Sequence, residues 1–302
     1  MASSGNDSSL TSMFSAITTT SDKSEQLLVH TEDQYGGVLI DASQLPESKT
    51  DFTVKLAASL TAWKKLAKRG IWLKVPIECS DFIASAVKEG FEFHHAETNY
   101  VMMTKWLADV PSTIPPNASH QVGVGAFVLN SKNEVLVVQE TSGPAAARKD
   151  FWKLPTGLVN QGEEIADGAI REVLEECGIR TKFLSMVGMR SAHNIGACKK
   201  SDLFFVCTLQ PLSEDIKIQE SEIAAAKWMD VEEWLALDFM KDSLYKQMYE
   251  WSLQSVNGSY VGMRATEMPI GFRPGTNMVY HMDQRSSWDF PDFPSLDSCQ
   301  IQ

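Results

Sequence analysis

The amino-acid sequence predicts an α/β protein with two folded domains. The chain has 302 residues, strand and helix patterns alternate along it, and a proline-rich connector at 110–117 separates two such series. A segment rich in serine and threonine, residues 1–26, is expected to be disordered because it has too few apolar residues for a core. We therefore expect domains at 27–110 and 117–253, followed by a loosely ordered tail at 254–302.

The first domain is predicted to be a small α/β unit. Apolar residues recur at helical intervals between Phe52 and Leu66, and Gly70 is expected to end that helix. Ser80 or Asp81 is expected to cap the next helix. In chain order, the expected elements are a strand at 37–40, a helix at 52–68, a strand at 71–75, a helix at 82–88 and two strands within 91–106.

The second domain is predicted to alternate strands around one long helix. Its expected elements are strands at 120–129 and 134–139, a mobile loop at 142–150, the helix that ends at Gly178, strands at 183–190, 203–210 and 224–229, and a helix from 231 with an acidic first turn. Within the tail, Met278–His281 is a candidate for one more strand.

Composition limits the classes of function. The net charge of -12 argues against general nucleic-acid binding, although a nucleotide can still bind where a metal reverses the local charge. No apolar run is long enough to predict a membrane span. The five cysteines are scattered and odd in number, which favours a reducing compartment over a disulfide framework or a zinc site. A cytoplasmic location is expected, with organelle import as the alternative.

The most informative segment runs from 157 to 179. Ala169, Ile170, Val173, Leu174 and Cys177 are predicted to form one apolar helix stripe, and Gly178 stands where a helix commonly ends. Glu172, Glu175 and Glu176 then share one face of this helix, where like charges repel. A divalent cation would offset that repulsion, because hard ions such as Mg²⁺ bind carboxylate and phosphate oxygens.

This segment matches the Nudix box, Gly-x5-Glu-x7-Arg-Glu-U-x-Glu-Glu-x-Gly-U with U a bulky aliphatic residue, at every defined position. The sequence therefore resembles the Nudix hydrolases. The resemblance implies a Nudix α/β/α sandwich and the hydrolysis of a nucleoside diphosphate linked to another moiety, with Mg²⁺ or Mn²⁺ as the cofactor. Gly157, the first residue of the box, is expected to allow a sharp turn before the helix.

Three segments of the first domain carry a second resemblance, namely DQYGGV at 33–38, GIWLKVP at 70–76 and AVKEGFEFHHAETNYVMM at 86–103. They resemble the domain that precedes the Nudix domain in one eukaryotic subfamily, which includes the antisense-fibroblast-growth-factor protein of animals and ADP-ribose/NADH pyrophosphatases of plants. That leading domain is similar to the acetyltransferase fold. The corresponding region here, KRGIWLKV, lacks the acetyltransferase pyrophosphate loop, so acetyl transfer is not expected.

The Nudix resemblance implies roles for the charged residues of the box. Glu172 and Glu176 are the implied metal ligands, and Glu175 is implied to bind the metal directly or through water. Arg171 matches the arginine that orients a glutamate of the box. Glu163 matches a residue that assists the metal shell, although an acidic residue at a helix start is also favourable by itself.

The general base is left open between the box and a later loop. Glu172 is the candidate from the box. Glu220 and Glu222 are the loop candidates, and Glu222 matches a recurrent family position better because it directly precedes a predicted strand.

Substrate contacts are expected from residues near the box. Trp152 is a candidate for stacking on a base, with packing in the core as the alternative. Gly157 is a candidate for bringing backbone amides close to a phosphate. Arg190 and His193, together with 200–202, are candidates for contacts with phosphate or ribose, unless they form an ordinary exposed loop.

We therefore expect a pyrophosphohydrolase that splits ADP-ribose, NADH or a related compound into AMP and a second phosphorylated product. One alternative is a hydrolase of capped RNA or oxidised nucleotides, and the acidic balance weakens the RNA option. Another is a regulatory interaction protein in which catalysis is secondary. The expected partners are a nucleotide-sugar or dinucleotide substrate and, as a homodimer, a second copy of the chain.

Overall fold

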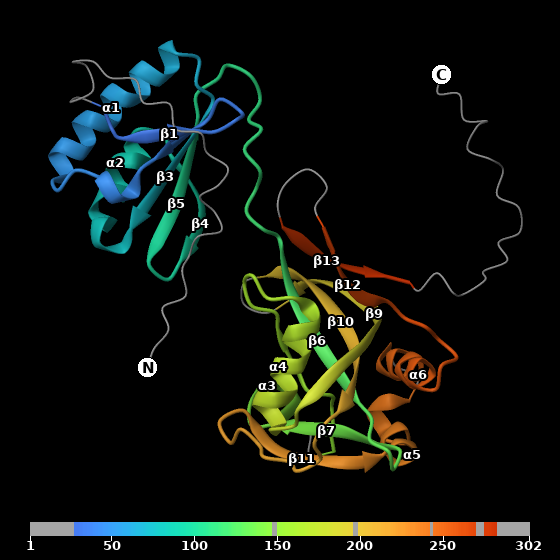
Figure 1. Cartoon of the computed structure of the whole chain (residues 1–302). Coiled ribbons are helices and arrows are strands. Elements are labelled where there is room, and N and C mark those ends of the chain that lie inside the picture. Colours follow the sequence, from blue (N-terminus) through green and yellow to red (C-terminus); the bar gives the residue numbers. More distant parts are fainter. Residues whose placement is uncertain (1–26, 147–149, 196–198, 242–243, 270–274, 283–302) are drawn as a thin grey trace, which may run out of the picture. The chain divides into compact units, whose positions relative to one another are not determined.

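The computed structural model describes residues 27–146, 150–195, 199–241, 244–269 and 275–282. The chain divides into two units between Ala118 and Ser119 (Figure 1), and each unit has hydrophobic clusters of its own. The predicted tail at 1–26 lies outside the described residues, as does 283–302.

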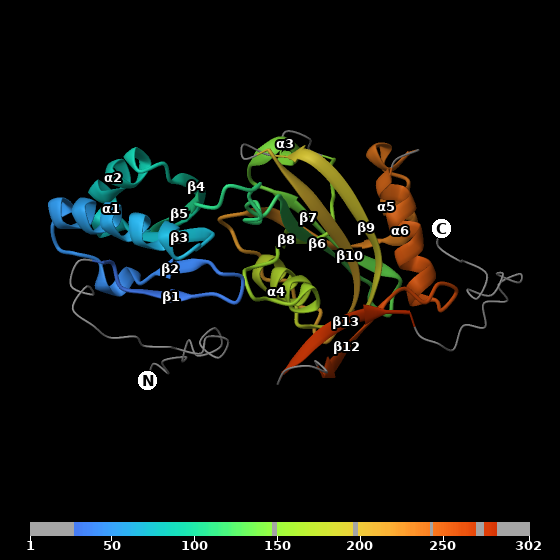
Figure 2. The same cartoon turned by 90° about the horizontal axis from the view of Figure 1, so that it is seen from above.

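A five-stranded sheet forms the centre of the first unit. The strands lie in the order β1 (His30–Glu32), β2 (Val38–Ile40), β3 (Gly70–Pro76), β5 (Tyr100–Trp106) and β4 (Glu92–Glu97). β2 and β3 run parallel, and the other neighbours are antiparallel. Helices α1 (Lys49–Lys65) and α2 (Ile83–Lys88) lie along this sheet (Figure 2), and Phe52 and Phe82 stack within the shared core.

The helices of the first unit differ in detail from the predicted ones. Helix α1 begins after the N-cap residue Ser48 and ends at Lys65, three residues before the predicted end, and Gly70 instead opens β3. Ala67 turns the chain there with a φ of 55°. Ser80 and Asp81 do not cap α2, because the 3-10 helix at Ile77–Phe82 runs directly into it. Strand β1 was not predicted.

The second unit is a three-layer α/β/α sandwich. Its main sheet has the strand order β8 (Thr156–Leu158), β6 (His120–Val128), β10 (Lys200–Pro211) and β9 (Thr181–Ile195). Helices α4 (Ile165–Cys177) and α6 (Leu244–Val256) pack on its opposite faces (Figure 2). Neighbouring strand residues point to opposite faces, so Cys207 packs in the cluster that includes α4, while Val206 packs with Met248 of α6.

The remaining elements surround this sandwich. They are the paired strands β7 (Glu134–Glu140) and β11 (Ile223–Asp230), helices α3 (Gly143–Ala146) and α5 (Val231–Leu235), and the hairpin of β12 (Arg264–Pro269) and β13 (Thr276–His281). Short 3-10 helices occur at Ala42–Gln44 and Asp238–Met240. The predicted strand near 278 is β13, whereas α6 and β12 were not predicted. Across the described ranges, no helix has the length and apolar character to cross a membrane.

Candidate active site

Helix α4 carries Arg171, Glu172, Glu175 and Glu176, and Glu163 lies just before it. It ends at Gly178, whose φ of 68° lies in the left-handed region, so the predicted helix and its glycine stop are confirmed. Ala169, Val173 and Cys177 are fully buried against the sheet, as the predicted stripe requires. Leu174 does not belong to that stripe, because it is 47% exposed at the solvent edge of the helix.

Arg171 holds three carboxylates of the box together. Its Nε and Nη2 donate to the two carboxylate oxygens of Glu163 at 2.7 and 2.9 Å. Its Nη1 donates to Glu172 Oε1 at 2.7 Å and to Glu175 Oε2 at 2.9 Å, and Nη2 also reaches the Leu158 carbonyl at 2.8 Å. The bond from Arg171 lowers the pKa of Glu163, and Glu163 in turn raises the pKa of Arg171.

Gly157 makes room for the Glu172 carboxylate. A Cβ atom at Gly157 would lie 2.0 Å from Glu172 Cδ, so any larger residue here would force the Glu172 carboxylate to move. Gly157 lies within strand β8 and is not among the positive-φ residues, so the predicted sharp turn at this glycine is wrong. Its glycine identity follows from close packing. Burial raises the pKa of Glu172, and Arg171 opposes that shift.

Glu176 is the most buried carboxylate of the box. Its residue is 4% exposed, and its Oε2 has no hydrogen-bond partner within the described residues. Burial raises the pKa of Glu176 to about 8, Lys153 opposes the shift, and the charge of Glu172 adds to it. A buried carboxylate oxygen without a partner is costly, so this position is suited to a group that neutralises it.

Lys153 and Glu140, two residues that sequence reasoning missed, lie close enough to Glu176 to influence its charge. Lys153 forms an ion pair with Glu140 at 2.5 Å and donates to Thr156 Oγ1 at 2.6 Å. An isolated bridge between Val138 and Lys153 places this lysine beside the end of β7. The short interval between Lys153 and the box was the only signal in the sequence, because their contact depends on strand pairing.

The carboxylates have the chemistry of a hard divalent-ion site but are not gathered into one. Within the described ranges, no group of three or more His, Cys, Asp or Glu side chains is placed to hold a metal ion. Arg171 occupies oxygens of Glu172 and Glu175, while Glu176 retains its unpaired buried oxygen. The donor set therefore fits Mg²⁺ or Mn²⁺ in charge and atom type, and binding requires these side chains to rearrange.

The loop candidates for the general base follow Gln219, whose N donates to the Glu176 carbonyl at 3.2 Å, but they do not belong to the Arg171 hydrogen-bond network described above. Glu220 and Glu222 are exposed in the turn before β11. The Glu222 carbonyl accepts a hydrogen bond from Thr141 N at 2.8 Å, which places this turn beside the end of β7. No ion pair of the Glu222 carboxylate is recorded within the described part of the chain.

Arg190 and His193 are engaged along β9 and β10. Arg190 Nη2 pairs with Asp202 Oδ2 at 2.5 Å, and its guanidinium carbon lies 5.1 Å from the ring centre of Phe204. His193 Nδ1 lies 2.8 Å from Ser201 Oγ. These partners bring both residues together with 200–202, and no hydrogen bond or ion pair joins either of them to the described carboxylates of the box.

Trp152 packs beside the core of the second unit. It is half-buried against the cluster that includes Trp234, whose Nε1 donates to the Trp152 carbonyl at 2.8 Å. Lys227 Nζ lies 4.8 Å from the centre of the Trp152 ring. One face of this ring is therefore already occupied by a cation.

Comparison with known proteins identifies the family. Residues 28–107 match the model described as Nudix hydrolase domain, and 119–252 match the NUDIX domain. Nudix hydrolase 8 of Arabidopsis thaliana is 45% identical over 86% of this chain and 70% of that protein. Nudix hydrolase 2 of the same plant is 43% identical over 84% of this chain and 91% of that protein. Human nucleoside diphosphate-linked moiety X motif 6 is 39% identical over 66% of this chain and 64% of that protein.

This chain belongs to the Nudix hydrolase family, in the subfamily that has a leading domain before the Nudix domain. It is therefore a hydrolase, and the α/β/α sandwich of the second unit is the fold that the sequence predicted. Nudix hydrolases generally use divalent metal ions.

Proposed function

We propose that this Nudix hydrolase cleaves the diphosphate of a nucleoside diphosphate linked to another moiety, with ADP-ribose and NADH as preferred substrates. The observation that carries the proposal is the group of carboxylates held by Arg171 next to the buried Glu176, whose Oε2 has no hydrogen-bond partner among the described residues. The choice of ADP-ribose and NADH rests on the resemblance of the first domain to that of plant pyrophosphatases.

Within this site, Glu172 and Glu176 are proposed to hold Mg²⁺ or Mn²⁺, with Glu175 binding directly or through water. When bound, the ion would neutralise part of the charge of the diphosphate and lower the pKa of a water that it coordinates. Arg171 positions Glu172 and keeps Glu163 ionised through paired hydrogen bonds. Lys153 adds a positive charge close to Glu176.

The reaction adds water across the diphosphate. Water attacks one phosphorus, the bond from that phosphorus to the bridging oxygen breaks, and the second phosphate leaves with the bridging oxygen. A carboxylate accepts the proton that the attacking water loses. We propose Glu222 for this role because it is exposed in a turn beside β7, with Glu172 as the alternative. ADP-ribose then gives AMP and ribose 5-phosphate, and NADH gives AMP and reduced nicotinamide mononucleotide.

The direct test is a substrate screen with the full chain and saturating Mg²⁺ or Mn²⁺. ADP-ribose, NADH, coenzyme A, a diadenosine polyphosphate and capped RNA are compared, and the products are separated and identified. We expect the highest kcat/KM for ADP-ribose or NADH, with AMP as one product. Preferential cleavage of capped RNA, or no cleavage of any of these compounds, would overturn the substrate proposal.

Variants test the assigned residues. Glu172→Gln is expected to lower kcat by roughly two to four powers of ten, the range for loss of a metal ligand or base. Glu222→Gln is expected to lower kcat by a similar factor. Glu232→Gln, an exposed residue of α5, is the matched control and should retain activity.

We also propose a cytoplasmic location. Cys79, Cys177 and Cys207 are free thiols, which suits a reducing compartment. Fractionation that recovers the native protein within an organelle would contradict this proposal.

A further inference from the structure

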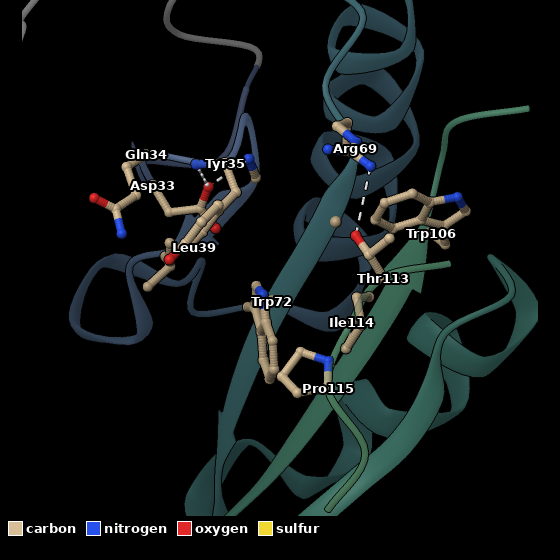
Figure 3. Close-up of a pocket in the computed structure, with 12 residues that line it drawn as sticks. Asp33, Gln34, Tyr35, Leu39, Arg69, Trp72, Trp106, Thr113, Ile114 and Pro115 are labelled. Atoms are coloured by element: carbon tan, nitrogen blue, oxygen red, sulfur yellow. Dashed lines mark hydrogen bonds between the residues drawn. The ribbon is translucent and has the colours of Figure 1, made fainter. Parts of the chain in front are cut away.

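The first unit contains a cavity of ≈ 650 Å³ (Figure 3). All of its lining residues lie between 33 and 115, so it is separate from the carboxylates of the box. Leu39 and Trp72 line it, while their strand neighbours Ile40 and Leu73 belong to the core shared with α1 and α2. Because successive strand residues alternate between faces, the cavity occupies the sheet face opposite this core. Its size is within the usual range for small-ligand pockets.

The connector that follows β5 forms a fixed wall of this cavity. His94 Nε2 lies 2.8 Å from the Pro115 carbonyl, to which it donates a hydrogen bond. Trp106 Nε1 donates to the Val110 carbonyl at 2.6 Å. Gly70 lets the connector pack closely, since a Cβ atom there would lie 3.3 Å from Ile114 Cγ1. The wall is therefore held by side chains of β4 and β5.

The cavity lining carries one cation, Arg69, and one anion, Asp33. The guanidinium of Arg69 lies 5.0 Å from the ring centre of Trp106, and its Nη2 is 3.5 Å from Thr113 Oγ1. No ion pair between Arg69 and a carboxylate is recorded among the described residues. Asp33 also lines the cavity, but its Oδ1 accepts hydrogen bonds from Tyr35 N at 2.8 Å and Gly37 N at 2.7 Å.

Aromatic surface accompanies this charge. Figure 3 shows the rings of Tyr35, Trp72 and Trp106 around the cavity together with Arg69. Tyr35 is 72% exposed, which is unusual for a large side chain that only supports the fold. Aromatic side chains stack on the flat face of a nucleobase whatever its identity. A guanidinium binds phosphate or carboxylate groups.

We propose that this cavity is a second ligand site, which takes a planar aromatic ring bearing an anionic group, as in a mononucleotide. The ring stacks on Trp72 and Tyr35, and the anion pairs with Arg69. The proposal does not depend on the reaction assigned to the Nudix box.

The test measures the binding of AMP to the full chain by calorimetry, with a chelator present so that no metal serves the box. Adenosine supplies the ring without the anion, and ribose 5-phosphate supplies the anion without the ring. We expect saturable AMP binding that weakens at least about tenfold when either part is removed, the size expected for one stacking or charged contact. Hydrogen exchange should slow at 69–73 and 112–114 when AMP binds.

Arg69→Gln and Trp72→Leu should each raise the dissociation constant for AMP by about tenfold or more. Lys88→Gln and Phe93→Ala are the matched controls, because both are exposed in the same unit and do not line the cavity. Thermal unfolding checks that each variant is folded. If Trp72→Leu unfolds, the Arg69 variant and the exchange measurement on the unaltered protein still decide the outcome.

Three results would overturn the proposal. They are no AMP binding at millimolar concentration, equal binding by the Arg69→Gln protein and its Lys88→Gln control, and slowed exchange confined to 157–178. Failure of the substrate screen would leave this outcome unaffected, because binding is measured without metal and without turnover.

Discussion

Arg171 and Glu176 lie on one helix, but their surroundings have opposite effects on the ionised form of a carboxylate. Arg171 pairs with carboxylates and keeps Glu163 ionised, whereas burial of Glu176 favours its protonated form. A helix that only had to be stable would avoid this arrangement, because an unpaired buried oxygen costs free energy and adds nothing to packing. The cost is explained when the carboxylates serve a ligand, as in the proposed metal site.

Gly157→Ala tests whether residue 157 must be glycine because Glu172 packs closely against it, rather than because the backbone needs flexibility there. The added methyl group must displace Glu172, whose Cδ lies 2.0 Å from the position of that Cβ. We expect kcat to fall by about a hundredfold, since small displacements of catalytic groups have effects of that size. Gly188→Ala is the control, because its Cβ would meet only Trp251 at 3.7 Å. Equal activities for the two variants would contradict this explanation.

The raised pKa of Glu176 makes stability depend on pH. The folded state binds this proton more tightly than the unfolded chain, because burial raises the pKa from 4.5 to about 8. The contribution is therefore fully present below about pH 4.5 and is lost as the pH rises through 8. In chelator, the melting temperature should fall over this interval, and Glu176→Gln should reduce that fall.

Metal should reverse the direction of this dependence. Metal binding requires the ionised carboxylate, so the stabilisation produced by Mg²⁺ should grow as the pH rises. Melting curves with and without Mg²⁺ at several pH values measure this difference. A Mg²⁺ effect of constant size, equal in the Glu176→Gln protein, would remove Glu176 from the proposed metal site.

At the scale of elements, α4 depends on segments that are distant in sequence. Its C-terminal glycine packs against Lys217, whose Cβ and carbonyl oxygen would lie 2.9 and 3.1 Å from an added Cβ. At the other end, Ala166 N donates to Tyr280 Oη of β13 at 3.0 Å. The hairpin of β12 and β13 therefore contacts the start of the box helix, although the sequence offered only a weak strand signal there.

Gly178→Ala should destabilise the second unit for two reasons. The φ of 68° is unfavourable for alanine, and the methyl group would crowd Lys217. We expect a loss of about 2 to 4 kcal/mol in the free energy of unfolding, from left-handed strain and overpacking together. Gly162→Ala is matched, because it has a φ of 79° with nothing within 4 Å and should lose only about 1 kcal/mol. Chemical denaturation of both variants measures the difference.

At the scale of the whole molecule, the two units have separate cores. The core cluster of the first contains residues between Leu28 and Leu107, and those of the second begin at Val124. Because no buried cluster among the described residues contains residues from both units, we expect each to unfold with its own transition.

Phe52→Ala should lower the transition of the first unit alone. Phe52 is fully buried and stacks on Phe82 at 4.5 Å, so its truncation should cost about 3 to 5 kcal/mol. Turnover at the Nudix box should persist at temperatures where the first unit has unfolded. Phe127→Ala, at an equally buried site of the second unit, should have the opposite effect. A single calorimetric transition that both variants shift equally would show that the units unfold together.

The sequence by itself determined the box helix, its glycine stop and the two-part α/β pattern. These features depend on residue spacing within short segments. The period of the apolar residues predicts the helix or strand, and the capping residues predict where it ends. It also determined the family, because the box matches at fixed positions and the comparisons agree.

Only the tertiary structure decided how the box carboxylates differ from one another. The burial of Glu176, its neighbour Lys153 and the tight fit of Gly157 over Glu172 all arise where separate strands meet α4. The same holds for the cavity at Trp72, whose wall is a connector that looks unstructured in sequence. Such contacts depend on which strands pair, and spacing along the chain does not specify those pairings.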